Sequence, residues 1–143
     1  MTTLVLIADD QRSVASATER LIRTRIKKDP VLGRKQTIYH VCFSTSEAMN
    51  TVDSFLASSI GNRDRRIVLV TDGDFGEPRT GIDLIRVVRM RCESSVRCHA
   101  VLYTATDRLA DEANREVNPI SVFMKPNLPE EFFQGVFAFL RSR

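Results

Sequence analysis

Five short apolar runs alternate along the chain with longer segments in which apolar residues recur at helical spacing. The runs are continuous and rich in valine, isoleucine and leucine, as expected for strands that are covered on both faces. They lie near residues 4–8, 38–43, 67–71, 100–103 and 120–124. The pattern predicts five buried strands of one parallel sheet.

The segments that follow the runs predict five helices. The first four are indicated by apolar stripes, which are Val14, Ala17, Leu21, Ile22 and Ile26; Ala48, Val52, Phe55 and Leu56; Leu84, Ile85 and Val88; and Leu109, Ala113 and Val117. The last follows Pro129 and has two acids, Glu130 and Glu131, in its first turn, which is typical of a helix start. Alternating strands and helices require right-handed crossovers, so we predict an α/β protein with a three-layer α/β/α architecture.

Length and composition are those of an ordinary globular domain, with 143 residues, of which 43% are hydrophobic and 27% charged. No apolar run approaches the roughly 20 residues that span a bilayer, and the run at 4–8 is too short for a secretion signal. Cys42, Cys92 and Cys98 are odd in number and form no CxxC pair. This argues against a disulfide scaffold or a zinc site and predicts a cytoplasmic protein without a membrane partner.

Charge is distributed unevenly over the predicted fold. The net charge of +3 is too small to indicate nucleic-acid binding by itself. Basic residues concentrate in the helix-to-strand connections, at one pole of the sheet: Lys27, Lys28, Arg34, Lys35, Arg63, Arg65, Arg66, Arg89, Arg91 and Arg97. Acids crowd the opposite pole: Asp9, Asp10, Asp72, Asp74, Glu77 and Asp107. Two interpretations of the basic pole remain open, a solvated face or a docking surface for an acidic partner or nucleic acid.

Polar groups with distinctive chemistry follow four of the predicted strands. Asp9 and Asp10 come after the first, Asp72 after the third, Thr104 after the fourth and Lys125 after the fifth. In an open α/β sheet the carboxyl ends of the strands converge on one crevice, where ligands bind. Carboxylates, a hydroxyl and an ammonium gathered there suit a divalent cation and a phosphoryl group.

In this order the fragments resemble a response-regulator receiver domain of two-component signalling, and the resemblance covers essentially the whole chain. Asp9-Asp10 resembles the acidic pair of the family, and Asp72 resembles its phosphoacceptor. Thr104-Ala105, Lys125-Pro126 and Gly81 resemble its switch hydroxyl, its Lys-Pro pair and the glycine of its phosphoacceptor loop. The resemblance implies a flavodoxin-like, five-stranded parallel sheet in the order 2-1-3-4-5, flanked by five helices. It also implies a single receiver domain over 1–143 with no output domain.

The resemblance assigns a role to each site residue. Asp72 would accept a phosphoryl group from the phosphohistidine of a sensor histidine kinase or phosphotransfer protein. Mg²⁺ would be bound by Asp10 directly, by Asp9 through water, by Asp72 and by the backbone carbonyl of Asp74, while Thr104 and Lys125 would bind phosphoryl oxygens. The protein would then be no enzyme in the usual sense, since it would catalyse only its own phosphorylation and dephosphorylation.

The same resemblance implies a switched docking surface for a downstream target. Inward movement of Thr104 would shift the face made by the fourth and fifth helices. Two departures from the family pattern bear on this expectation. Val122 stands where most receivers have a switching aromatic, and the loop after Asp72 lacks a Met-Pro pair. The last helix has more aromatics than one buried face requires, so Phe132 or Phe139 is a candidate partner contact, with burial by neighbouring loops as the alternative.

Two other functions remain as alternatives. One is a receiver-fold interaction module that is never phosphorylated, which the Val122 position and the altered loop keep open. The other is a haloacid-dehalogenase-like phosphatase, because Asp72-Gly73-Asp74 resembles its nucleophile motif and Thr104 and Lys125 follow in order. Against the phosphatase, the acidic pair precedes the lysine, and only Glu130 and Glu131 follow it.

Overall fold

Five parallel strands form one sheet in the order β2-β1-β3-β4-β5, which confirms the predicted fold. The structure is a computed structural model that describes residues 1–58, 64–92 and 96–143. The strands are β1 (Thr2–Ala8), β2 (Gln36–Cys42), β3 (Arg65–Thr71), β4 (Arg97–Thr104) and β5 (Ser121–Met124). The helices are α1 (Arg12–Lys28), α2 (Thr45–Ala57), α3 (Gly81–Cys92), α4 (Asp107–Asn114) and α5 (Glu130–Arg141), with a 3-10 turn at Leu32–Arg34.

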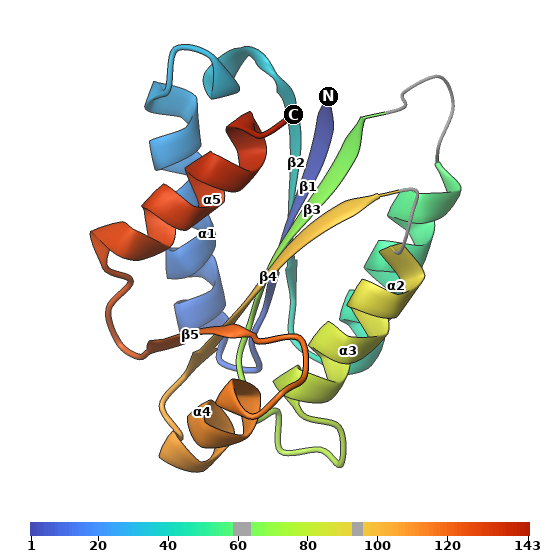
Figure 1. The fold of residues 1–143 in the computed structure, drawn as a ribbon, viewed down its shortest axis with the longest axis vertical. Coiled ribbons are helices and arrows are strands. Elements are labelled where there is room, and N and C mark those ends of the chain that lie inside the picture. The colour runs from blue at the N-terminus through green and yellow to red at the C-terminus, as the bar shows by residue number, and fades with distance from the viewer. Residues whose placement is uncertain (59–63, 93–95) are drawn as a thin grey trace.

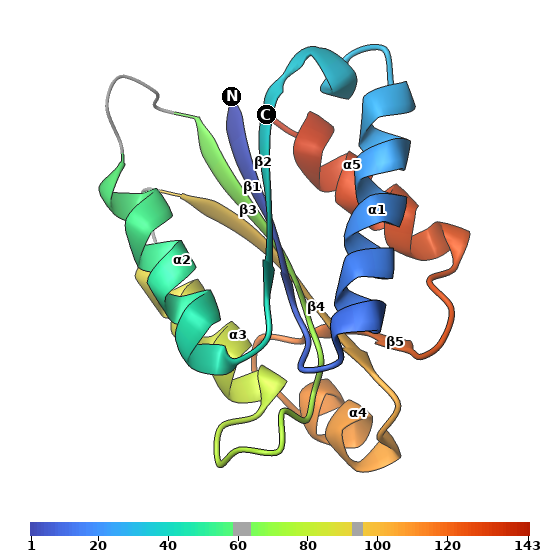
Figure 2. The same ribbon diagram turned by 180° about the vertical axis from the view of Figure 1, so that it is seen from behind.

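Helices cover both faces of the sheet. α1 and α5 pack on one face, and α2 and α3 pack on the other (Figures 1 and 2). Alternate residues of β1 supply the two cores, because successive side chains of a strand point to opposite faces. Leu4 and Leu6 pack with α2, α3 and α4, whereas Val5 and Ile7 pack with α1 and α5.

The buried face of α1 differs from the predicted one. Ala17 and Leu21 are exposed, while Ala15, Thr18, Ile22 and Ile26 are buried. Thr18 can be buried because its hydroxyl donates a hydrogen bond of 2.8 Å to the carbonyl of Val14, so no polar group is left unpaired. Ile22 and Ile26 are thus buried as predicted, whereas Ala15 and Thr18 take the places expected for Ala17 and Leu21 on the buried face.

One further expectation for side-chain burial is wrong, and for Phe132 the alternative of burial holds in place of a partner contact. The fourth helix ends at Asn114, so Val117 lies beyond it and is fully exposed. Phe132 is only 1% exposed and packs edge-on against Phe123 and Phe133, which rules it out as a ready partner contact. Phe139 is half-buried and stacks on His99, with ring centroids 5.4 Å apart.

Arginines of the basic pole bind the carboxyl ends of two helices. Arg65 Nη1 donates to the carbonyls of Phe55 and Leu56 at the end of α2, at 3.1 and 3.0 Å. Arg66 Nη1 donates to Phe139 and Leu140 at the end of α5, at 2.6 and 3.0 Å. Ser58 Oγ also donates to Phe55 O at 2.9 Å, and Ser142 Oγ donates to Phe139 O at 2.6 Å, so the arginines add charged donors to the helix ends.

Arg66 is 4% exposed, so a solvated face is the wrong interpretation for this residue. Arg63 lies outside the described residues. Both chain termini lie side by side at this pole (Figures 1 and 2). None of the helices in the described ranges is long and apolar enough to cross a membrane.

Candidate functional site

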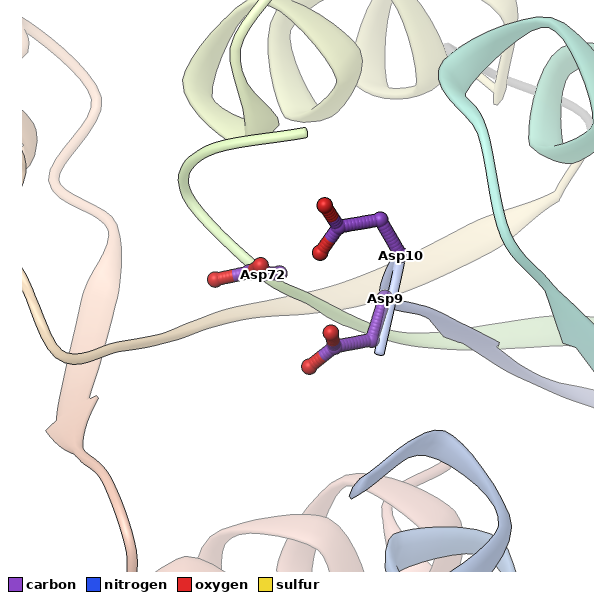
Figure 3. Close-up of side chains that lie close together, drawn as sticks. All are labelled: Asp9, Asp10 and Asp72. Carbon is purple, nitrogen blue, oxygen red and sulfur yellow. The ribbon is translucent and has the colours of Figure 1, made fainter. Parts of the chain in front are cut away.

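Three carboxylates meet at the carboxyl edge of the sheet. Ala8 and Thr71 are paired at the ends of β1 and β3, and Asp72 N donates to Ala8 O at 2.7 Å. This register places Asp9 and Asp10 beside Asp72, and Figure 3 shows the three side chains grouped together. Each offers an oxygen that lies within 4.8 Å of the others. The sheet thus brings together residues that are far apart in the sequence.

Lys125 joins this group from the end of β5. Its Nζ lies 2.7 Å from Asp9 Oδ2 and 3.2 Å from Asp72 Oδ1. Its backbone N–H donates to Thr104 O at 2.9 Å, which ties the residue to the end of β4. The following bond to Pro126 is cis. The ammonium therefore lies between two of the three carboxylates and partly neutralises them.

The environment of Asp72 changes its acidity. Burial and the nearby charge of Asp9 raise the pKa of Asp72 to about 6, against the opposing effect of Lys125. Burial alone would lower the pKa of Lys125, but its hydrogen bond to Asp9 and the charge of Asp72 outweigh burial and raise it. At neutral pH the dominant state is therefore a carboxylate at Asp72 beside an ammonium at Lys125.

The backbone around Asp72 is tightly held. Gly73 N donates to Asp72 Oδ1 at 2.8 Å, and Thr71 Oγ1 donates to the carbonyl oxygen of Asp72 at 2.9 Å. A Cβ atom on Gly81 would lie 1.9 Å from that same oxygen, so only glycine fits at the start of α3. Thr71 was missed by the sequence analysis, although a hydroxyl at the end of an apolar strand, directly before the key acid, was a usable signal.

The acids of the loop after Asp72 are engaged elsewhere. Asp74 accepts a hydrogen bond from Gly76 N at 2.9 Å, so its side chain closes a local turn. Gly76 has a φ of 68°, a conformation that favours glycine. Glu77 accepts from Thr45 N at 3.0 Å, at the first residue of α2. Metal binding by the backbone carbonyl of Asp74 stays a prediction. Glu77 is hydrogen-bonded to α2, so it is not a free acid at the rim of the site.

Thr104 is buried beside the loop that follows Asp72. It is 1% exposed, and its Oγ1 accepts a hydrogen bond from Thr106 N at 3.1 Å. A Cβ atom on Gly73 would lie 2.9 Å from Thr104 Oγ1, which shows how closely the loop approaches this hydroxyl. An open cavity of about 330 Å³ adjoins it and is lined by Asp10, Gln11, Asp72, Asp74, Gly76, Ala105, Thr106 and Lys125.

Val122 is half-buried and packs against the core under α2 and α3. An aromatic that does contact the site is Tyr103, one residue before Thr104. Its hydroxyl donates to the carbonyl of Pro126, and Lys125 Nζ lies 5.8 Å from its ring centroid. Tyr103 therefore connects β4 to the loop that carries the lysine.

The donor set fits a hard divalent cation. Within the described residues, Asp9, Asp10 and Asp72 are the one group of three acids, histidines or cysteines close enough to share a metal ion. All their donor atoms are oxygens, which Mg²⁺ prefers. Asp10 is exposed, so its carboxylate can reach an ion from solvent.

Comparison with known proteins agrees with this architecture. No protein-family model matches the sequence, and no curated protein sequence matches it either. Among solved structures, the chain is similar to the signal receiver domain of an HD domain-containing protein from Pseudomonas fluorescens Pf-5. The TM-score is 0.64 at 17% identity, over 98% of this chain and 95% of that one. The chain has the receiver fold.

A second solved structure is similar to the chain over almost its whole length. It is a two-component transcriptional regulator AraC from Clostridium phytofermentans ISDg, with a TM-score of 0.57 and 15% identity, over 98% of this chain and 99% of that one. At such low identity the likeness concerns the fold alone. The chemistry of the site must therefore be inferred from the residues at the carboxyl edge of the sheet.

Proposed function

We propose that the protein is a response-regulator receiver that takes a phosphoryl group onto Asp72. The observation that carries the proposal is the grouping of Asp9, Asp10, Asp72 and Lys125 at the carboxyl edge of a receiver fold. The donor would be the phosphohistidine of a histidine kinase or a phosphotransfer protein. The output would be docking of a downstream target near α4 and α5.

Asp72 would act as the nucleophile. A pKa of about 6 leaves the carboxylate ionised at neutral pH, as attack on phosphorus requires. An oxygen of Asp72 bonds to phosphorus, the P–N bond to histidine breaks, and the electron pair stays on the ring nitrogen. Lys125, already 3.2 Å from Asp72, supplies a positive charge to the phosphoryl oxygens, and Thr104 would supply a hydroxyl.

Asp10 directly, Asp9 through water, Asp72 and the Asp74 carbonyl would hold Mg²⁺ at this edge. When bound, the ion would neutralise negative charge on the transferring group and on the carboxylates. Asp9 is 3% exposed, and its Oδ1 accepts a hydrogen bond from Gln11 N at 2.9 Å. That bond fixes the direction of the carboxylate, as an outer ligand needs.

The geometry favours this role over the phosphatase. A phosphatase of the haloacid-dehalogenase type would need acids after Lys125, but Glu130 pairs with Arg25 on α1 at 2.6 Å. The remaining alternative is an interaction module that is never phosphorylated. It shares the fold and differs only in chemistry, so an experiment can distinguish the two.

The test is incubation with acetyl phosphate and MgCl₂, read by intact mass. We expect wild type to gain one phosphoryl group and Asp72→Asn to gain none. Asp107→Asn removes an exposed acid at the start of α4 and should behave as wild type. Omission of MgCl₂ should abolish the adduct. An unmodified wild type would support the interaction module, and an adduct on Asp72→Asn would place the acceptor elsewhere.

A further inference from the structure

Two cysteines share one cavity at the pole opposite the carboxylates. Cys92 is the last residue of α3, and Cys98 is the second residue of β4. Both line an open cavity of about 420 Å³ together with Arg89 and Arg97. Cys92 is 2% exposed, and Cys98 is half-buried and packs against the core that contains Cys92. The fold thus places two thiols on one open cavity, and Cys98 is the more exposed of the two.

The two thiols differ in character because they interact. A hydrogen bond from Cys98 lowers the pKa of Cys92, and the same interaction raises the pKa of Cys98. Cys92 is therefore the better nucleophile, and Cys98 is its protonated neighbour. A pair of interacting thiols that lines an open cavity suits reversible oxidation, in which one thiol reacts first and the other resolves the product.

We propose that Cys92 and Cys98 form a reversible disulfide when the protein meets a hydroperoxide. The Cys92 thiolate attacks the peroxide, the O–O bond breaks, and sulfenic acid and hydroxide form. The Cys98 sulfur then attacks the sulfenic sulfur, and its proton leaves with the hydroxyl group as water. The peroxide is reduced and the two thiols are oxidised, and a dithiol reductant reverses the change.

Cys42 provides a control within the same chain. It is fully buried at the end of β2, and burial raises the pKa of its thiol. Its Sγ lies 3.5 Å from Thr51 Oγ1 and not beside another cysteine. We expect it to stay reduced. The cavity also lies away from Asp72, so this inference does not depend on the proposed phosphorylation.

The test is treatment of the whole protein with hydrogen peroxide, followed by alkylation in denaturant and peptide mapping without reductant. We expect one intramolecular link between Cys92 and Cys98, an alkylated Cys42, and full reversal by dithiothreitol. Cys42→Ala should form the link like wild type, and Cys98→Ala should form no internal link.

Three results would overturn the proposal. They are alkylation of all three cysteines after peroxide, a link that includes Cys42, and a link between two chains in place of the internal one. The wild-type map decides between these outcomes even if a cysteine variant does not fold.

Discussion

The most unusual single residue is Asp72, a carboxylate held where burial and a second acid both oppose its charge. Its pKa of about 6 lies above the ordinary value of 3.8. In the absence of metal, the native chain therefore binds a proton at this residue more tightly than the unfolded chain does. The stabilising effect of that proton is complete below about pH 4 and is lost as the pH rises through about 6.

This shift predicts that Asp72→Asn stabilises the protein more as the pH rises, since asparagine carries no charge at any pH. In EDTA, the free energy of unfolding of the variant minus that of wild type should rise between about pH 4 and about pH 7. Urea denaturation at a series of pH values measures it. A flat difference for Asp72→Asn would mean that its pKa is ordinary.

Gly81 is a second residue whose identity is set by the site. In Gly81→Ala the new methyl group meets the backbone carbonyl of Asp72, so we expect destabilisation by about 1–3 kcal/mol and slower phosphorylation. Gly135→Ala is the matched control, because its nearest neighbour would be His99 at 3.8 Å. Alanine inside α5 should stabilise by about 0.5–1 kcal/mol. Thermal and urea unfolding distinguish the two, and equal effects would contradict the steric argument.

At the scale of elements, helix ends explain much of the basic pole. Arg65 and Arg66 lie at the start of β3 and reach the carboxyl ends of α2 and α5, which lie on opposite faces of the sheet. They can do so because successive side chains of a strand point to opposite faces. The beginning of one strand therefore fixes two helices.

Arg66→Ala should destabilise the protein by about 2–3 kcal/mol, because it leaves buried helix carbonyls without their charged donor. Arg141→Ala is the comparison. Arg141 lies in the same region and pairs with Asp29; its guanidinium is exposed although the Asp29 side chain is mostly buried, and a pair that is open to solvent contributes about 1 kcal/mol or less. Urea denaturation of the two variants tests the difference. A loss from Arg141→Ala as large as that from Arg66→Ala would contradict this account.

The order of strands and helices could be predicted from the sequence because apolar runs and stripes mark the residues that become buried. Two of the errors, at Thr18 and Arg66, have a common cause, since polar groups with internal partners look exposed in a sequence. Thr18 bonds to its own helix and Arg66 bonds to another, and both are buried. The strands β3 and β4 likewise begin earlier than predicted, at Arg65 and Arg97.

At the scale of the whole molecule, the site could be anticipated because parallel strands bring their carboxyl ends to one edge. The strand order alone was enough to predict that four residues meet there, namely Asp9, Asp10, Asp72 and Lys125. The engagement of Glu77 with Thr45 could not be foreseen, because it depends on the path of a loop. Val122 is not aromatic, so the path of a conformational change also depends on packing that the sequence does not reveal. Tyr103, next to Thr104, is the candidate to take the role of the missing aromatic.

Binding of Mg²⁺ should stabilise the whole molecule, because the unfolded chain has no clustered carboxylates. At a concentration about 100 times the Kd the gain would be about 2.7 kcal/mol. We expect MgCl₂ to raise the Tm of wild type, and NaCl of equal ionic strength to have less effect. Asp10→Asn should remove most of the rise. An equal rise in both proteins would indicate a general salt effect.

The neighbouring chain ends have a practical consequence. Both lie at the pole away from the carboxylates (Figure 1), so a fluorophore or a surface anchor attached to either would leave the crevice open to a docking protein. A short peptide could also join the two ends, so that the backbone could be opened elsewhere. Such a circularly permuted chain would keep the three acids in place. A fluorescent reporter inserted at the new opening could then signal the binding of Mg²⁺ to them.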